Sequence, residues 1–132
     1  MESTRELVWL GSTLEDLREF PDESRREVGF ALRQAQNGKK APNAKPLKGF
    51  HGTSVLEIVD NFDSDTFRAV YTVRFEEAVY VLHCFQKKSK SGISTPKQDI
   101  DLIERRLKQA EKEHQEWLKT QPPAPPKTNK KK

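Results

Sequence analysis

Three short apolar segments with very short connections constrain the fold of this chain most. They are residues 54–60 (SVLEIVD), 66–75 (TFRAVYTVRF) and 78–87 (AVYVLHCFQK), and they are rich in the β-branched and aromatic residues that favour strands. The connections are only a few residues long, too short for a crossover between parallel strands. The sequence therefore predicts a three-stranded antiparallel meander.

Alternation along these strands predicts two different faces. The odd positions of 66–75 are apolar or aromatic, whereas the even positions include Arg68 and Arg74. In 78–87 we expect one face to carry Tyr80, Leu82 and Cys84, and the other to carry Val79, Val81, His83 and Phe85. The apolar face should lie under helices. The face with arginine and histidine is the better candidate for function.

Helices are predicted before the meander. Residues 6–10 (ELVWL) form a short strand, and residues 12–20 follow as a short helix with a capping box made by Ser12 and Glu15. A second helix over 21–38 has apolar residues at spacings of three and four and ends at Asn37-Gly38. The two helices should form an antiparallel hairpin.

The rest of the chain divides into loop, helix and tail. Residues 39–54 contain two prolines and two glycines and are predicted to be loop. Residues 95–118 are predicted to be a long amphipathic helix that is capped by Thr95. We therefore expect one α+β domain over 1–118, with a helical hairpin on a small, mainly antiparallel sheet and a C-terminal helix. The Pro- and Lys-rich residues 119–132 should be a disordered tail.

Charge is sorted along the chain. The 132 residues include 24 Lys and Arg, but five of these lysines lie in the tail, which leaves 19 basic against 20 acidic residues. Residues 28–56 contain five basic residues and no acid, and residues 78–98 contain four basic residues and no acid. If these two segments meet in space, they form a patch that attracts polyanions.

Several classes of protein are disfavoured. No apolar run approaches the roughly 20 residues that span a bilayer, and the start of the chain does not resemble a signal peptide. The single cysteine, Cys84, cannot form an internal disulfide, which favours a reducing cytoplasm. We expect Cys84 to pack in the core, because nothing near it would activate a thiol. No metal-binding or phosphate-loop motif is present, so no metal or other cofactor is expected.

The motifs LKG (47–49), FRAVY (67–71) and FQKKS (85–89), in this order, resemble the RelE/ParE superfamily of toxins from bacterial toxin–antitoxin systems. The chain is most similar to the HigB-like, phage-associated branch, from about residue 5 to residue 113. This resemblance implies a RelE-like fold in which a helical hairpin packs on a curved sheet. It also implies a metal-independent endoribonuclease that cleaves mRNA, often on the ribosome, and a helix-turn-helix antitoxin that neutralises it. ParE-like members inhibit DNA gyrase instead, so that activity stays an alternative, as does a non-toxic interaction protein of the same fold.

RNA cleavage without a metal needs a base for the 2′-OH, an acid for the leaving oxygen, and cations for the charge at phosphorus. The catalytic candidates are Arg68, Lys88 and His83. Arg68 matches the arginine of the strand motif, and its planar guanidinium can bind two phosphate oxygens. Lys88 matches the basic end of the last strand, and His83 titrates near neutral pH. The candidates for RNA binding are Lys48, His51, Arg74, Phe85, Lys87 and Lys90.

Several of these residues also have a structural interpretation. An arginine inside an apolar strand is costly to bury without a partner, and Glu57 on the neighbouring strand could be that partner. His83 could satisfy hydrogen bonds in the interior, and Phe85 could pack in the core. His114 lies on the apolar stripe of the last predicted helix and is expected to be structural.

Overall fold

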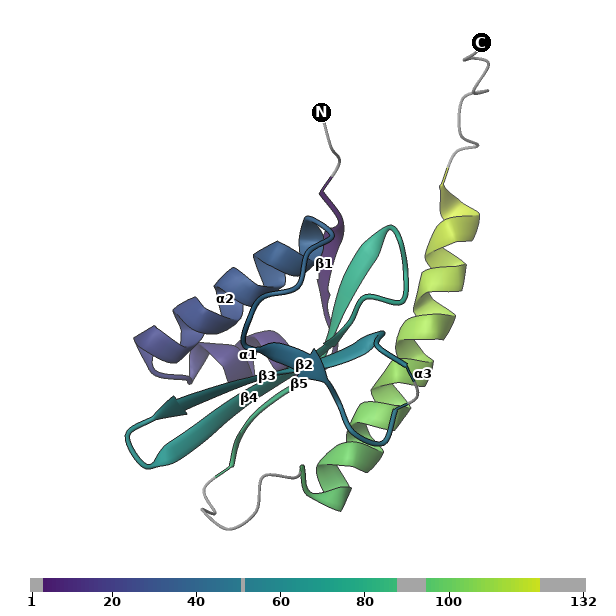
Figure 1. Ribbon diagram of the computed structural model, residues 1–132. Coiled ribbons are helices and arrows are strands. Elements are labelled where there is room, and N and C mark those ends of the chain that lie inside the picture. Colours follow the sequence, from purple (N-terminus) through teal and green to yellow (C-terminus); the bar gives the residue numbers. More distant parts are fainter. Residues whose placement is uncertain (1–3, 51, 88–94, 122–132) are drawn as a thin grey trace.

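The computed structural model describes residues 4–50, 52–87 and 95–121 (Figure 1). A five-stranded sheet of strand order β1-β5-β4-β3-β2 forms its centre. The strands are β1 (Glu6–Trp9), β2 (Ala44–Pro46), β3 (Val55–Phe62), β4 (Asp65–Thr72) and β5 (Ala78–Lys87). β1 pairs with β5 in parallel, and all other neighbours are antiparallel. The predicted meander of three strands and the α+β class are confirmed.

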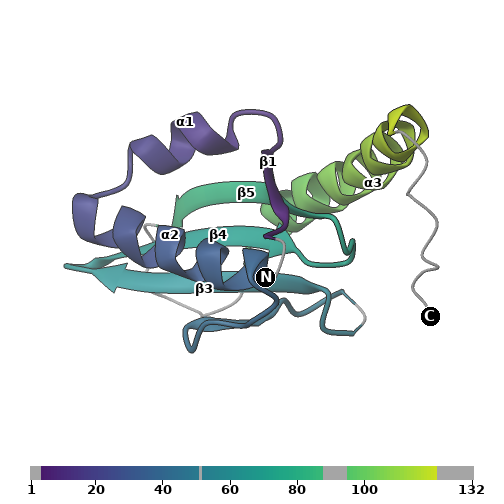
Figure 2. The same cartoon turned by 90° about the horizontal axis from the view of Figure 1, so that it is seen from above.

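Helices cover both faces of this sheet, as Figures 1 and 2 show. They are α1 (Thr13–Arg18), α2 (Asp22–Gln36) and α3 (Lys97–Thr120). α1 and α2 pack on one face, and α3 crosses the other. The face with arginine and histidine, which the sequence made the better candidate for function, is therefore covered by α3, because the apolar stripe of this helix buries itself there. No helix in the described ranges is long and apolar enough to cross a membrane.

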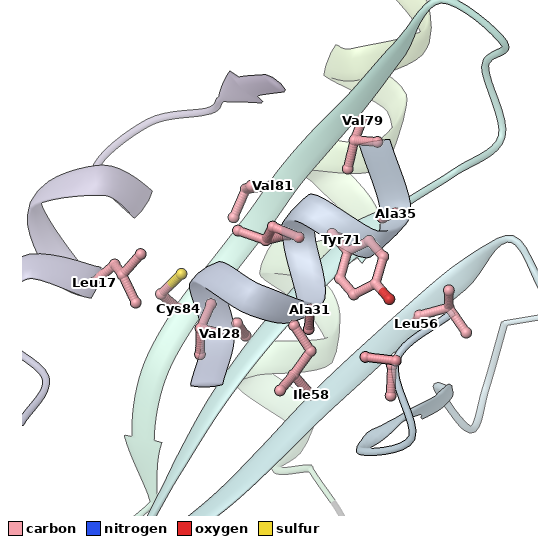
Figure 3. Close-up of a cluster of buried hydrophobic side chains, with 14 of the residues drawn as sticks. Leu17, Val28, Ala31, Ala35, Leu56, Ile58, Tyr71, Val79, Val81 and Cys84 are labelled. Atoms are coloured by element: carbon pink, nitrogen blue, oxygen red, sulfur yellow. The ribbon is translucent and has the colours of Figure 1, made fainter. Parts of the chain in front are cut away.

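The first core lies between the helical hairpin and the sheet (Figure 3). Val28, Ala31, Leu32 and Ala35 of α2 are buried, at the spacing of three and four residues that predicted this helix. They pack against Leu56, Ile58, Tyr71, Val79 and Val81. Burial raises the pKa of Tyr71 to about 12, because the phenolate form would lose its hydration. Cys84 is in the same core, and burial raises the pKa of its thiol to about 12, which confirms its packing role.

A β-bulge in β5 changes which side chains share a face. Tyr71 pairs with Val81 and Val70 pairs with His83, so Leu82 is the extra residue. Tyr80 and Leu82 share a face as expected, and it lies under α3, whereas Cys84 faces α1 and α2 together with Val79 and Val81. The sequence alternation was therefore wrong after the bulge, for His83, Cys84 and Phe85, since one inserted residue reverses the period-2 pattern.

An arginine of α3 is bonded to the backbone at the bulge. Arg106 Nη1 donates a hydrogen bond to the carbonyl oxygen of Leu82 at 2.9 Å. The guanidinium also lies against Gly11, where an added Cβ would be 2.7 Å from Nη2 of Arg106. Gly11 has a φ of 54°, which a residue with a side chain adopts only at a cost. Arg106 therefore joins α3 to the sheet and to the turn after β1.

Local boundaries differ from expectation in four places. The predicted loop over 39–54 contains β2, and β4 ends at Thr72 rather than at residue 75. The expected caps were wrong as well, because neither α1 nor α3 has a side-chain hydrogen bond at its N-cap. Ser12 donates instead to Asp16, and Thr95 donates to Glu57 on the sheet. In both cases the hydroxyl is bonded to a carboxylate, and hydrogen bonds to an ionised acceptor are stronger than those between neutral groups.

The second core holds α3 against the sheet. Ile103, Leu107 and Ala110 of α3 are buried against residues that include Val70, Tyr80 and Leu82. Farther along, His114 is buried, bonded to Tyr80 and Glu77, and stacked on Phe75. The structural role expected for His114 is confirmed.

We predict that Ile103→Ala destabilises the protein by about 2–5 kcal/mol, because Ile103 is fully buried under α3. Leu118→Ala on the same helix is the matched control, since Leu118 is 44% exposed and its truncation should change stability by less than about 0.5 kcal/mol. Urea denaturation measures both. Equal effects of the two changes would mean that α3 is not docked as described.

Candidate functional site

A buried ion pair occupies the face of the sheet under the start of α3. Arg68 Nη1 donates to Glu57 Oε2 at 3.1 Å, and both residues are 4% exposed. Thr95 Oγ1 accepts from Arg68 Nη1 at 3.2 Å and donates to Glu57 Oε2 at 2.8 Å. The partner considered for Arg68 in the sequence is therefore its partner in the structure. The cluster joins β3, β4 and the residues just before α3.

Strand pairing brings four strands together at this point. Lys45 of β2 is opposite Glu57 of β3, and Glu57 is opposite Val70 of β4. Arg68 lies two residues from Val70, hence on the same face, and is opposite Phe85 of β5. Lys45, Glu57, Arg68 and Phe85 thus come from four adjacent strands and share one face of the sheet.

A groove of about 490 Å³ opens beside the ion pair. Glu57 and Thr95 line it, and Ile100 of α3 adds an apolar side. Lys45 and Lys48, both exposed, line it from β2 and the turn that follows. We call this the lysine groove. It combines cations with a buried carboxylate–guanidinium pair, which is suited to holding an anion next to a group that accepts protons.

His83 lies on the same face, but in a structural setting. It is 8% exposed, its Nε2 is 2.7 Å from Asp99 Oδ1 of α3, and its ring stacks on Phe85. Desolvation lowers the pKa of His83, and the nearby Asp99 opposes this shift. Its Nδ1 is buried and has no hydrogen-bond partner within the described ranges, so a second proton there would be unsatisfied. These contacts make His83 a link between β5 and α3.

The remaining predicted residues are spread over the structure. Phe85 is half-buried in the second core, and Lys87, also half-buried, is opposite Thr66 at the end of β5. Arg74 is exposed, follows β4 and forms an ion pair with Glu111 of α3. It lies beyond the end of β4 at Thr72, and it is not part of the groove lining. Arg74 is therefore not brought into the lysine groove.

Three predicted residues, His51, Lys88 and Lys90, lie outside the described ranges, as does the tail from residue 122. Within the described ranges, no group of three or more His, Cys, Asp and Glu side chains could hold a metal ion.

Sequence reasoning missed three groups of this site. Lys45 was counted only as part of a basic segment, Glu57 only as a structural partner, and Thr95 only as a helix cap. The acid-free segment 28–56 next to an acidic strand residue was the available signal for Lys45 and Glu57. No local pattern could have placed Thr95 on the sheet, because that contact joins residues 38 positions apart.

A comparison with models of protein families shows which family this chain belongs to. A model of phage-derived Gp49-like proteins (DUF891) matches residues 15–108, which is more than half of the chain. The chain belongs to this family. Gp49-like proteins are a RelE/toxin-like family of toxin–antitoxin systems, so the resemblance at the level of toxin type is confirmed. No curated protein matches this Gp49-like chain significantly.

We predict that Arg68→Ala destabilises this Gp49-like protein by about 3–5 kcal/mol, because it leaves the carboxylate of Glu57 buried without its counter-ion. The double change Glu57→Leu and Arg68→Met should cost less than Arg68→Ala alone, since it removes both charges and keeps apolar volume. Chemical denaturation measures all variants. A double variant less stable than Arg68→Ala would contradict the pairing.

The lowered pKa of His83 predicts a loss of stability in acid. Below about pH 6.5 the unfolded chain binds a proton at this residue more readily than the folded chain does, so the free energy of unfolding falls as pH falls. His83→Gln can keep the hydrogen bond to Asp99 without titrating. Its stability should therefore depend less on pH between 7 and 5 than that of the wild type. Identical changes in the free energy of unfolding between these two pH values would contradict this role.

Proposed function

We propose that this protein is the toxin of a type II toxin–antitoxin system, in the HigB-like branch, and that it cleaves mRNA without a metal ion. Membership in a RelE/toxin-like family supports the class of protein. The single observation that carries the activity is the lysine groove, in which Lys45 and Lys48 accompany the Glu57–Arg68 pair. In such a site the lysines can bind the phosphates of RNA, and the carboxylate can accept the proton that the 2′-OH loses.

The reaction uses the 2′-OH of the RNA as nucleophile on the adjacent phosphorus. Glu57 accepts the proton of the 2′-OH, and Lys45 and Lys48 hold the phosphate that develops extra charge. The leaving 5′-oxygen takes its proton from an ammonium group. Our candidate for this proton donor is Lys88 of the FQKKS motif. The products are a cyclic phosphate and a 5′-hydroxyl.

Arg68 has a different part in this proposal from the one its motif implies. At 4% exposure its guanidinium is bound to Glu57 and Thr95 rather than open to a phosphate. Arg68 is therefore a positioning residue that fixes the Glu57 carboxylate at the floor of the groove. Its electrostatic field also reaches a phosphate bound above Glu57, because the interior screens charge less than water does.

The partner in this proposal is a helix-turn-helix antitoxin that covers the lysine groove with an acidic segment. Charge pairing between such a segment and exposed lysines is screened by salt, so the complex should weaken as ionic strength rises. The mRNA is cut while it is translated on the ribosome, in the cytoplasm.

The test compares paired lysine variants on RNA in the presence of EDTA. We expect Lys45→Gln with Lys48→Gln to lose cleavage, whereas Lys108→Gln with Lys112→Gln, two exposed lysines of α3, should keep it. Glu57→Gln should lower the rate by about 10²–10⁴, because it removes the base while keeping the shape of the side chain. Circular dichroism and urea unfolding confirm that each variant is folded.

Two outcomes would overturn the proposal. Cleavage that stops in EDTA would exclude the metal-independent reaction. Growth arrest with intact mRNA would exclude the nuclease, and accompanying DNA damage would identify a gyrase inhibitor instead.

A further inference from the structure

A second cationic pocket lies on the opposite face of the sheet from the lysine groove. Its volume is about 380 Å³. Ala35, Leu56 and Val73 give it an apolar floor, and all three belong to or pack against the first core, under α2. Arg5, Gly38, Lys39, Lys40, Pro46 and Thr53 complete its lining. We call this the rear pocket.

The rear pocket has a positively charged lining, and Glu77, which does not line the pocket, interacts electrostatically with Arg5. Among the residues that the structure describes, its lining includes Arg5, Lys39 and Lys40 and no acidic residue. Within the same ranges, none of these three residues forms an ion pair. Lys40 donates one hydrogen bond to the carbonyl of Ala44, which leaves two of its three N–H groups for a ligand. Three cations over an apolar floor match a ligand that is negative at one end and flat and apolar at the other.

The rear pocket and the lysine groove meet at β2, the edge strand of the sheet. Lys45 is opposite Glu57 and lines the groove, whereas Pro46 is opposite Leu56 and lines both cavities. Lys39 and Lys40 of the rear pocket and Lys45 and Lys48 of the groove are close together in sequence and lie in or next to β2, whereas Arg5 precedes β1 at the other edge of the sheet. A single strand that leaves the groove can therefore pass around β2 and stay next to positive charge.

The edge of β2 is closed to an added protein strand. The N–H of Ala44 donates to Ala41, and its carbonyl accepts from Lys40. Pro46 has no N–H to offer. An extended peptide could not pair with this edge, so the backbone gives no reason to place a protein segment there. The ligand must instead be recognised through the cations and the apolar floor.

We propose that the rear pocket binds one nucleotide of the RNA strand whose cleavage site lies in the lysine groove. The base buries apolar surface against the aliphatic floor formed by Leu56 and Val73, and its phosphate is held by Arg5, Lys39 and Lys40. A volume of about 380 Å³ is at the small end of ligand pockets and suits one nucleotide rather than a helix. This inference rests on the proposed function, which it deepens by adding a second RNA subsite.

The test measures binding of non-cleavable 2′-O-methyl RNA of about 4 and about 16 nucleotides, a range that brackets one and two subsites. Two variants change the rear pocket without touching the groove: Lys39→Gln with Lys40→Gln, and Thr53→Glu, which adds a carboxylate at an exposed lining position. The control is again Lys108→Gln with Lys112→Gln. We expect both rear-pocket variants to bind the long RNA more weakly, with a salt slope reduced by about 0.7 for each phosphate that the variant no longer neutralises. Binding of the short RNA should stay unchanged.

A second measurement does not depend on RNA cleavage. Uridine monophosphate, titrated into labelled wild-type protein, should shift the NMR amide signals of Gly38, Lys39 and Thr53. If nucleotide shifts these amides but no RNA is cleaved, the proposed nuclease fails and the rear pocket stands as a nucleotide site. If RNA is cleaved while both rear-pocket variants bind long RNA like the wild type, the second subsite is wrong and the nuclease stands. If the rear-pocket variants bind RNA like the wild type but no longer bind an acidic peptide such as oligoglutamate, the pocket is a protein-binding site and the inference is overturned.

Discussion

The buried contact between Glu57 and Arg68 is the interaction on which the candidate site depends. Two opposite charges at 4% exposure are tolerable only because they are paired and hydrogen-bonded, and Thr95 supplies the additional bond to each. Since the three residues come from β3, β4 and the segment before α3, satisfying the charges also fixes where α3 starts. The hydrogen bonds of Thr95 that stabilise the ion pair therefore also position Thr95 and the start of α3, which form one side of the lysine groove.

α3 is attached to the sheet by polar contacts near its start, in its middle and near its end. Asp99 holds His83 near the start, Arg106 bonds the carbonyl of Leu82 at the bulge, and His114 joins Tyr80 and Glu77 near the end. Directional contacts of this kind fix the position of a helix along the strands more strictly than apolar packing does, because hydrogen bonds weaken steeply with distance and angle. His83, which the sequence made a candidate for acid–base chemistry, is used here for attachment, as is His114.

The lysine groove and the rear pocket both carry cations, but they differ in the other side chains that line them. The lysine groove is lined by the carboxylate of Glu57, whereas the floor of the rear pocket is apolar. A cleavage site needs the first arrangement, and a site that only holds a nucleotide needs the second. In the proposed function, the lysine groove is the cleavage site and the rear pocket is a second contact with the same RNA.

The sequence by itself determined α2, α3 and the three central strands, and it offered Glu57 as a candidate partner for Arg68. Periodicity of three and four predicted α2 and α3, short connections predicted the meander, and the cost of burying Arg68 pointed to Glu57. Only the tertiary structure decided that α3 covers the arginine face, that Leu82 forms a bulge, and that Lys45 and Lys48 line the groove beside the ion pair. The physical reason is that periodicity reports which faces are apolar but not which element will cover them. That choice is made by contacts such as Thr95 with Glu57, between residues far apart in the chain.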